Sequence, residues 1–149
     1  MGQRATSPLP RQFANPDNPW AHETTTGPEI LKQTGGRLDA FVMGVGTGGT
    51  LMGVGRAIRK AGVDAMVVAV EPDESAVMSG GKPGPHGIQG LADGFVPEIM
   101  RVSEADDIVR VKTADAKEAA HRLARAEGLL VGTSSGANVP AATEIARRL

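Results

Sequence analysis

A glycine-rich turn between an apolar run and a helical pattern constrains this fold more than any other feature. The run Ala40-Phe41-Val42-Met43 indicates a buried strand, and Gly44-Val45-Gly46-Thr47-Gly48-Gly49-Thr50 follows it directly. Apolar residues at helical spacing continue over residues 51–59. Glycines let the backbone approach a bulky anion, and the N–H groups and dipole of a helix N-terminus favour negative charge. The turn therefore predicts a phosphate site in which Thr47 and Thr50 add hydroxyl donors. A plain tight turn is the alternative.

The rest of the chain continues this alternation of strand and helix. Further strands are predicted over Met66–Val70, Asp107–Val111 and Leu129–Val131, with helices between them. Thr26 and Thr113 are expected to cap two of the helices. Because strands joined by helices form parallel units, we expect an α/β fold with an open, mainly parallel sheet and flanking helices. This domain should cover residues 24–149, after an irregular, proline-rich lead-in at residues 1–23.

Composition excludes several classes of function. The 149 residues carry a net charge of -1, so attraction to nucleic acid or to an anionic membrane is not expected, and no apolar run has the length of a membrane span. The absence of cysteine excludes disulfides and thiolate nucleophiles, and it fits a cytoplasmic protein. His22, His86 and His121 lack the spacing of metal ligands, so we expect no metal and interpret all three as surface or helix residues.

The glycines also fit a dinucleotide site. Gly44, Gly46 and Gly49 match the G-x-G-x-x-G pattern, and Glu71 ends the next strand where an acid would meet a ribose hydroxyl. This alternative is a nicotinamide-dependent oxidoreductase. A second strand-to-helix turn around Ser134 favours a small phosphorylated ring instead, because its hydroxyl could bond a ring nitrogen lying between the two strand ends. An ordinary serine N-cap is the alternative for Ser134.

Separate blocks of sequence, found in the same order, closely resemble the cysteine synthase (O-acetylserine sulfhydrylase) family. The blocks are Gln12–Pro19, His22–Ile30, Gly46–Thr50, Glu71-Pro72, His86–Leu91, Gly94–Pro97 and Gly132–Ala137. Cystathionine β-synthases share much of this pattern. The resemblance covers nearly the whole chain from Gln12 onward. It implies the large-domain portion of the tryptophan synthase β-like fold, with pyridoxal 5′-phosphate as cofactor.

The resemblance also implies roles for individual residues. The implied cofactor-binding residues are Gly46, Thr47, Gly48, Gly49, Thr50 and Ser134. The first five resemble a phosphate cradle, and Ser134 resembles the hydroxyl partner of the pyridine nitrogen. The implied substrate-binding residues are Gln12, near the substrate carboxylate, and Gly90, on the substrate side of the ring.

The reaction implied by the resemblance converts O-acetylserine and sulfide to cysteine and acetate by β-elimination and β-replacement. The Schiff-base lysine should lie upstream in a small N-terminal domain, in a segment resembling V-K-D-R, which this sequence does not contain. We therefore expect a partial domain without a catalytic residue, lacking the C-terminal end of the family as well, and incomplete activity. The family suggests a homodimer and binding of the serine acetyltransferase tail. A non-catalytic remnant that keeps the phosphate site is the alternative.

Overall fold

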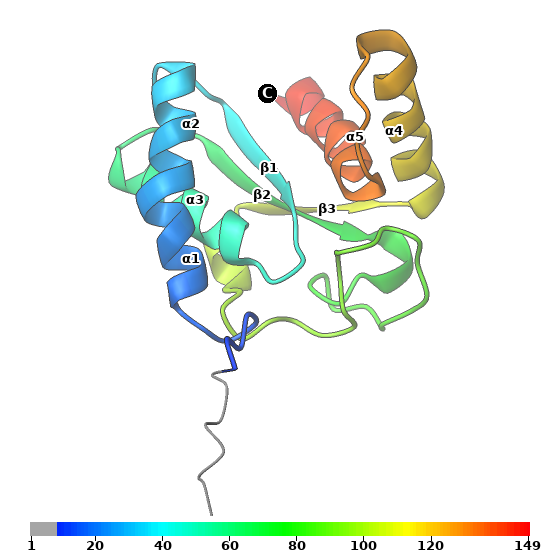
Figure 1. Ribbon diagram of the computed structural model, residues 1–149, viewed down its shortest axis with the longest axis horizontal. Helices are drawn as coiled ribbons and strands as arrows, with labels where there is room; N and C mark the ends of the chain where they lie inside the picture. Colours follow the sequence, from blue (N-terminus) through cyan, green and yellow to red (C-terminus); the bar gives the residue numbers. More distant parts are fainter. Residues whose placement is uncertain (1–8) are drawn as a thin grey trace, which may run out of the picture.

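Three parallel strands form the sheet, in the order β1-β2-β3 (Figure 1). They are β1 (Ala40–Gly44), β2 (Met66–Pro72) and β3 (Asp107–Val111). The computed structural model describes residues 9–149. In the register of the sheet, Gly44 lies opposite Val70 and Val70 lies opposite Val109, so the carboxyl ends of the strands share one edge. The predicted strands at these positions and the parallel sheet are confirmed.

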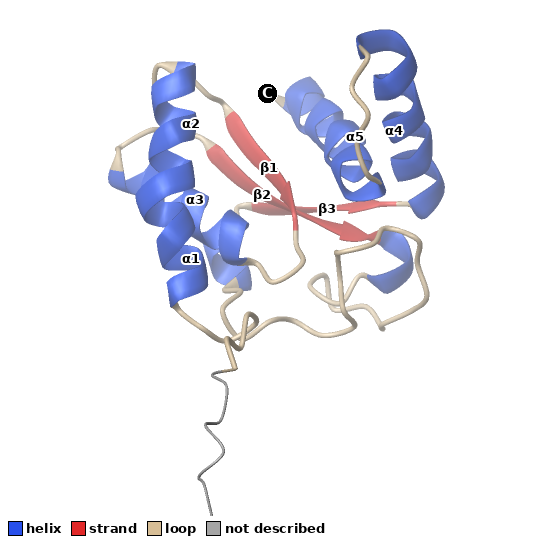
Figure 2. Cartoon of the chain, in the orientation of Figure 1, coloured by secondary structure: helices blue, strands red, loops and turns tan. Residues whose placement is uncertain are grey.

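The helices cover both faces of this sheet (Figure 2). They are α1 (Asp17–Ala21), a π-helical segment (His22–Thr26), α2 (Gly27–Thr34), α3 (Gly49–Lys60), α4 (Thr113–Glu127) and α5 (Thr133–Arg148). Short 3₁₀ turns lie at Asp73–Ser75 and Val102–Glu104. The α1–α3 helices lie on one side of the strands and α4 and α5 on the other (Figure 1). Within residues 9–149, no helix is long and apolar enough to cross a bilayer.

The central strand β2 supplies the core on both faces. Val67 and Ala69 pack with Leu51 of α3, whereas Val68 and Val70 pack against α4 and α5. All four β2 side chains are fully buried, as expected for a parallel strand covered on two sides. Burial of each valine contributes about 1.5–3 kcal/mol, so this strand fixes the sheet and the edge from which the loops leave.

The expected irregular lead-in at residues 1–23 is wrong from Asp17 onward, where α1 begins. Pro16 stands at the N-cap and Pro19 in the first turn, where a helix needs no backbone N–H, so neither proline interrupts it. Residues 1–8 lie outside the part that the structure describes. Thr26 does not cap a helix, because the backbone is helical on both sides of it. Thr113 makes no capping bond either; its hydroxyl accepts the Gly87 N–H at 3.0 Å.

The predicted strand at Leu129–Val131 is also wrong, because these residues are irregular. Gly128 ends α4 in a left-handed conformation, and Leu130 is then 93% exposed. An apolar run becomes a strand only where a neighbouring strand accepts its hydrogen bonds. Among residues 9–149, the sheet contains only β1, β2 and β3, and this run pairs with none of them.

Glycines let the α1–α2 segment lie close against α3. A Cβ at Gly53 would overlap the Pro19 carbonyl, and a Cβ at Gly27 would overlap the Ala57 side chain. The close approach brings His22, in the π-helical segment, within reach of Thr50 at the start of α3.

Candidate functional site

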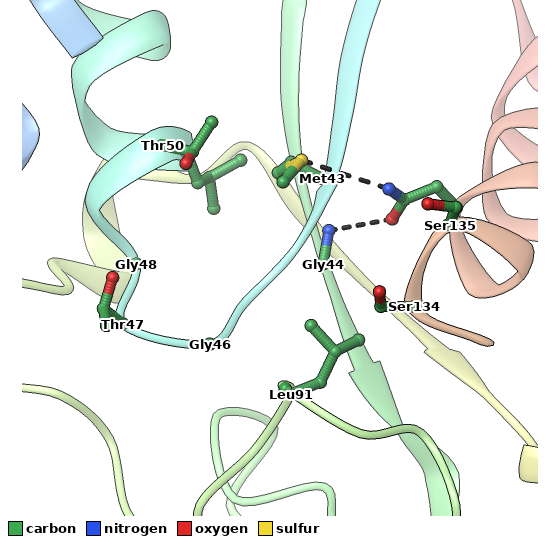
Figure 3. A pocket seen from close by; sticks show the side chains of 12 residues that line it. Met43, Gly44, Gly46, Thr47, Gly48, Thr50, Leu91, Ser134 and Ser135 are labelled. Atoms are coloured by element: carbon green, nitrogen blue, oxygen red, sulfur yellow. Dashed lines mark hydrogen bonds between the residues drawn. The ribbon is translucent and has the colours of Figure 1, made fainter. Parts of the chain in front are cut away.

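A cavity of about 210 Å³ lies where β1 ends, between the N-termini of α3 and α5 (Figure 3). It is lined by Met43, Gly44, Gly46, Thr47, Gly48, Thr50, Leu51, Gly90, Leu91, Ser134, Ser135 and Asn138. The structure thus brings together six of the predicted site residues from three distant parts of the chain. These are Gly46, Thr47, Gly48, Thr50, Gly90 and Ser134. Gly49 and Gln12 are not part of the lining.

The glycine-rich turn Gly46–Thr50, called the phosphate turn below because of the predicted phosphate site, leaves backbone donors at the start of α3. Gly48 is left-handed, with a φ of 86°, and it forms the N-cap of the helix. The N–H of Met52 reaches back to the Gly48 carbonyl at 3.0 Å, and the Gly49 N–H bonds to Thr47 Oγ1 at 3.2 Å. The N–H groups of Thr50 and Leu51, between these two, belong to the first helical turn, which has no intrahelical acceptors. Together with the helix dipole, they suit an anion.

Two glycines of this turn are required by close contacts. A Cβ at Gly46 would overlap the carbonyl oxygen of Gly90, and a Cβ at Gly49 would overlap the side chain of Asn18. Gly49 is therefore buried behind the turn rather than exposed to the cavity, whereas the contact between Gly46 and Gly90 closes one wall of the cavity.

Asn18 connects the turn to the N-terminal segment. Its Nδ2 donates to Thr47 Oγ1 at 3.0 Å and to the Gln12 carbonyl at 2.8 Å. The backbone of Gln12 is therefore held near the phosphate turn, while its side chain lies outside the cavity lining. Its expected contact with a substrate carboxylate stays a prediction.

His22 is not part of the cavity lining, but it contacts the lining residue Thr50, and the sequence interpretation missed this contact. Its Nε2 lies 3.2 Å from Thr50 Oγ1, and its Nδ1 lies 3.0 Å from Thr26 Oγ1. In the tautomer protonated on Nε2, His22 donates to Thr50 and accepts from Thr26. The Thr50 hydroxyl proton is then free for an anion. The separation of four residues between His22 and Thr26 on one helix was the only local signal of this chain of bonds.

The opposite wall is formed by the first turn of α5. Ser134 is the second residue of the helix, whose N-cap is Gly132, and no side chain caps it. The interpretation of Ser134 as an ordinary N-cap is therefore wrong. One turn later, Asn138 Oδ1 accepts the Gly44 N–H at 2.8 Å, as a dashed line in Figure 3 marks. Asn138 and Leu91 were not predicted, although Asn138 follows Ser134 at the i+4 position.

The cavity has no charged side chain among its lining residues. An anion there would be held by backbone donors, hydroxyl groups and the helix dipole rather than by an ion pair. Among residues 9–149, no three His, Asp or Glu side chains gather in a way that would hold a metal ion.

Glu71 does not serve a dinucleotide in this arrangement. Its side chain is fully buried, and its carboxylate accepts the N–H groups of Met78 at 2.8 Å and Ser79 at 3.0 Å, as well as the Ser79 hydroxyl. These bonds leave it unavailable to a ribose.

Comparison with known proteins shows the family to which this chain belongs. The model of the pyridoxal-phosphate dependent enzyme family matches residues 4–149. The chain belongs to this family. A cysteine synthase of Staphylococcus aureus is 50% identical over 141 residues, covering 94% of this chain and 46% of the relative. The chain thus spans about half the length of the curated relatives it matches.

Solved structures give the same result. A cysteine synthase of Entamoeba histolytica has a TM-score of 0.85 at 43% identity, covering 88% of this chain and 38% of that one. An O-acetylserine dependent cystathionine β-synthase of Helicobacter pylori has a TM-score of 0.89 at 40% identity, covering 95% and 46%. The expected family and the expected α/β fold of pyridoxal-phosphate enzymes are confirmed. The roles of the individual site residues stay predictions.

Proposed function

We propose that this chain forms the cofactor-binding part of a cysteine synthase and holds pyridoxal 5′-phosphate between its two glycine-containing turns. The observation that carries the proposal is a single uncharged cavity that the phosphate turn and Ser134 line from opposite sides. Its uncharged lining and its donors suit a ring with a phosphate at one end and a nitrogen at the other.

In this proposal, each wall of the cavity contacts a different part of the cofactor. The α3 N-terminus, Thr47 and Thr50 bind the phosphate. The Ser134 hydroxyl lies at the ring nitrogen, and because it is neutral it does not hold that nitrogen protonated. Leu91 provides an apolar wall, and Gly90, without a side chain, leaves room on the substrate side of the ring. When bound, pyridoxal phosphate supplies an electron sink for chemistry at the α and β carbons of an amino acid.

The proposed reaction is β-replacement on O-acetylserine with sulfide, giving cysteine and acetate. None of the five lysines of the sequence lines the cavity, so we propose that these 149 residues bind the cofactor without completing the reaction. The similarity to the Helicobacter pylori enzyme favours a second candidate, in which another thiol replaces sulfide. A homodimer, binding of the serine acetyltransferase tail and a cytoplasmic location stay predictions.

A cofactor titration tests the proposal. We expect saturable binding of pyridoxal phosphate, followed by absorbance, and no lysine adduct after borohydride treatment. A lysine adduct would show that the chain holds the cofactor covalently and would refute the incomplete site. Binding of a nicotinamide dinucleotide in the absence of any pyridoxal phosphate binding would overturn the proposed function in favour of an oxidoreductase.

Thr50→Val tests the phosphate cradle at one atom. The valine removes one charge-assisted donor, so affinity for pyridoxal phosphate should fall by about 1–3 kcal/mol, which is roughly five- to 150-fold. Thr143→Val is the matched control, because the Thr143 hydroxyl is exposed and bonds only to the Val139 carbonyl of its own helix at 2.8 Å. Equal affinities in the wild type and Thr50→Val would remove Thr50 from the cradle.

A further inference from the structure

We propose that Asn138 is a positioning residue, which fixes the distance between the two turns that grip the cofactor. The proposal rests on the proposed function, and it adds a residue that is outside both glycine-containing turns. Its side chain joins α5 to the last residue of β1, and it lines the cavity between them.

The first step of the argument is the backbone of β1. The N–H of Val45 donates to the Val70 carbonyl at 3.0 Å, so it points toward β2. Because successive N–H groups of a strand alternate in direction, the Gly44 N–H points to the other side, at the edge of β1. An edge N–H that is partly buried needs an acceptor. Asn138 Oδ1 is that acceptor, at 2.8 Å.

Close packing fixes the same junction. A Cβ at Gly44 would lie 2.8 Å from both methyl carbons of Leu91 and 3.4 Å from Asn138 Oδ1. The end of β1, the wall of the cavity at Leu91 and the side chain of Asn138 therefore meet at one point. Since Leu91 is buried, the junction has little freedom to rearrange.

Helix α5 connects Asn138 to Ser134 at the proposed cofactor site. Asn138 lies four residues after Ser134 on α5, so the two residues share one face of the helix. Gly44 is the last residue of β1, and Gly46, two residues later, begins the phosphate turn. The hydrogen bond between Asn138 and Gly44 thus sets the distance between the phosphate turn and the Ser134 hydroxyl. The affinity of a ligand that contacts both groups depends on this distance.

The second polar atom of Asn138 adds a donor to the cavity. Its Nδ2 has Met43 Sδ at 4.0 Å, a long contact with a weak acceptor. The amide therefore keeps donor capacity at the cavity, between the phosphate turn and Ser134. A carboxylate at this position would still accept the Gly44 N–H but would place negative charge beside a bound phosphate ester.

Two variants and two readouts test the proposal on the full chain. Asn138→Ala should speed hydrogen exchange of the Gly44 amide about tenfold, the effect of one lost hydrogen bond. It should weaken pyridoxal phosphate binding by about tenfold, while the affinity for inorganic phosphate, which contacts one turn only, changes less than twofold. Asn138→Asp should keep slow exchange at Gly44 and still weaken pyridoxal phosphate binding.

Thr143→Ala on the same helix is the control, and thermal unfolding checks that every variant is folded. Unchanged Gly44 exchange in Asn138→Ala would overturn the proposal. Equal losses for pyridoxal phosphate and inorganic phosphate would also overturn it, because a general loss of structure affects both. A wild type that binds no pyridoxal phosphate would refute the proposed function, and the Gly44 exchange would still decide whether Asn138 holds the strand end.

Discussion

Gly46→Ala is the sharpest test of the cavity wall formed by the phosphate turn. The added Cβ would overlap the carbonyl oxygen of Gly90, a backbone atom that no side-chain rotation removes. The Gly90 segment is braced, because the Ala92 N–H donates to the Val45 carbonyl at 3.0 Å and His86 Nε2 lies 3.1 Å from the Ala92 carbonyl. Relief of the overlap therefore distorts either the turn or this bracing.

Overpacking of this kind costs about 1–3 kcal/mol. For a chain of this size, that corresponds to a midpoint of thermal unfolding about 3–9 °C lower. Urea and thermal denaturation, followed by circular dichroism, measure both quantities. Gly132→Ala is the matched control in the other turn, because its φ is -78° and its Cβ would meet nothing within 4 Å. A Gly46→Ala protein within ~0.5 kcal/mol of the wild type would refute the close contact.

Two further variants concern carboxylates beside the sheet edge. Partial burial of the Glu74 carboxyl raises its pKa, but hydrogen bonds from the backbone and hydroxyl of Thr113 outweigh this effect, so the pKa lies below the ordinary value of 4.5. The ionised Glu74 carboxylate therefore stabilises the folded state above pH 4.5. This contribution is lost as the pH falls through the lower pKa that Glu74 has in the folded state. In urea denaturation from pH 7 to pH 3, Glu74→Gln should be less stable than the wild type at pH 7 and equal to it in acid; a constant difference would contradict the linkage. Glu71→Gln should destabilise the fold by about 1–3 kcal/mol, because the new amide group faces N–H donors in a buried site, and unchanged urea unfolding would show that loop rearrangement replaces the lost bonds.

Much of the fold follows from local sequence signals. The strand β2 is a continuous apolar run, and helix α3 begins directly after a glycine turn and ends near Gly62. The hydrophobic pattern and the flanking glycines therefore predict both elements. The glycine turn between β1 and α3 was predictable for the same reason, whereas its role as a phosphate site stays a proposal. Its backbone donors arise from the helix N-terminus itself, and a local pattern is enough to specify them.

The errors occurred where local signals depend on a distant neighbour. Leu129–Val131 has the composition of a strand, but strand formation requires a partner, and none of the described strands lies beside it. Residues 17–23 have a loop-like composition, yet their prolines fall only where a helix tolerates them, and packing of Gly27 and Gly53 against their neighbours holds the helix on α3. In both cases tertiary contacts overrode the local preference.

The contacts that support the cavity from behind its glycine turns could not be predicted from the sequence. Gly44 and Asn138 are 94 residues apart, and His22 and Thr50 are 28 apart, so no periodicity in the sequence links either pair. Yet these contacts hold the groups that line the site: His22 Nε2 lies 3.2 Å from the Thr50 hydroxyl, and Asn138 accepts the N–H at the end of β1. Motifs therefore specify which groups are available to a ligand, whereas contacts between distant elements specify their separation. A ligand that contacts one turn depends on the first property, and a ligand that spans both turns depends on the two together, which is why pyridoxal phosphate and inorganic phosphate should respond differently to a change at Asn138.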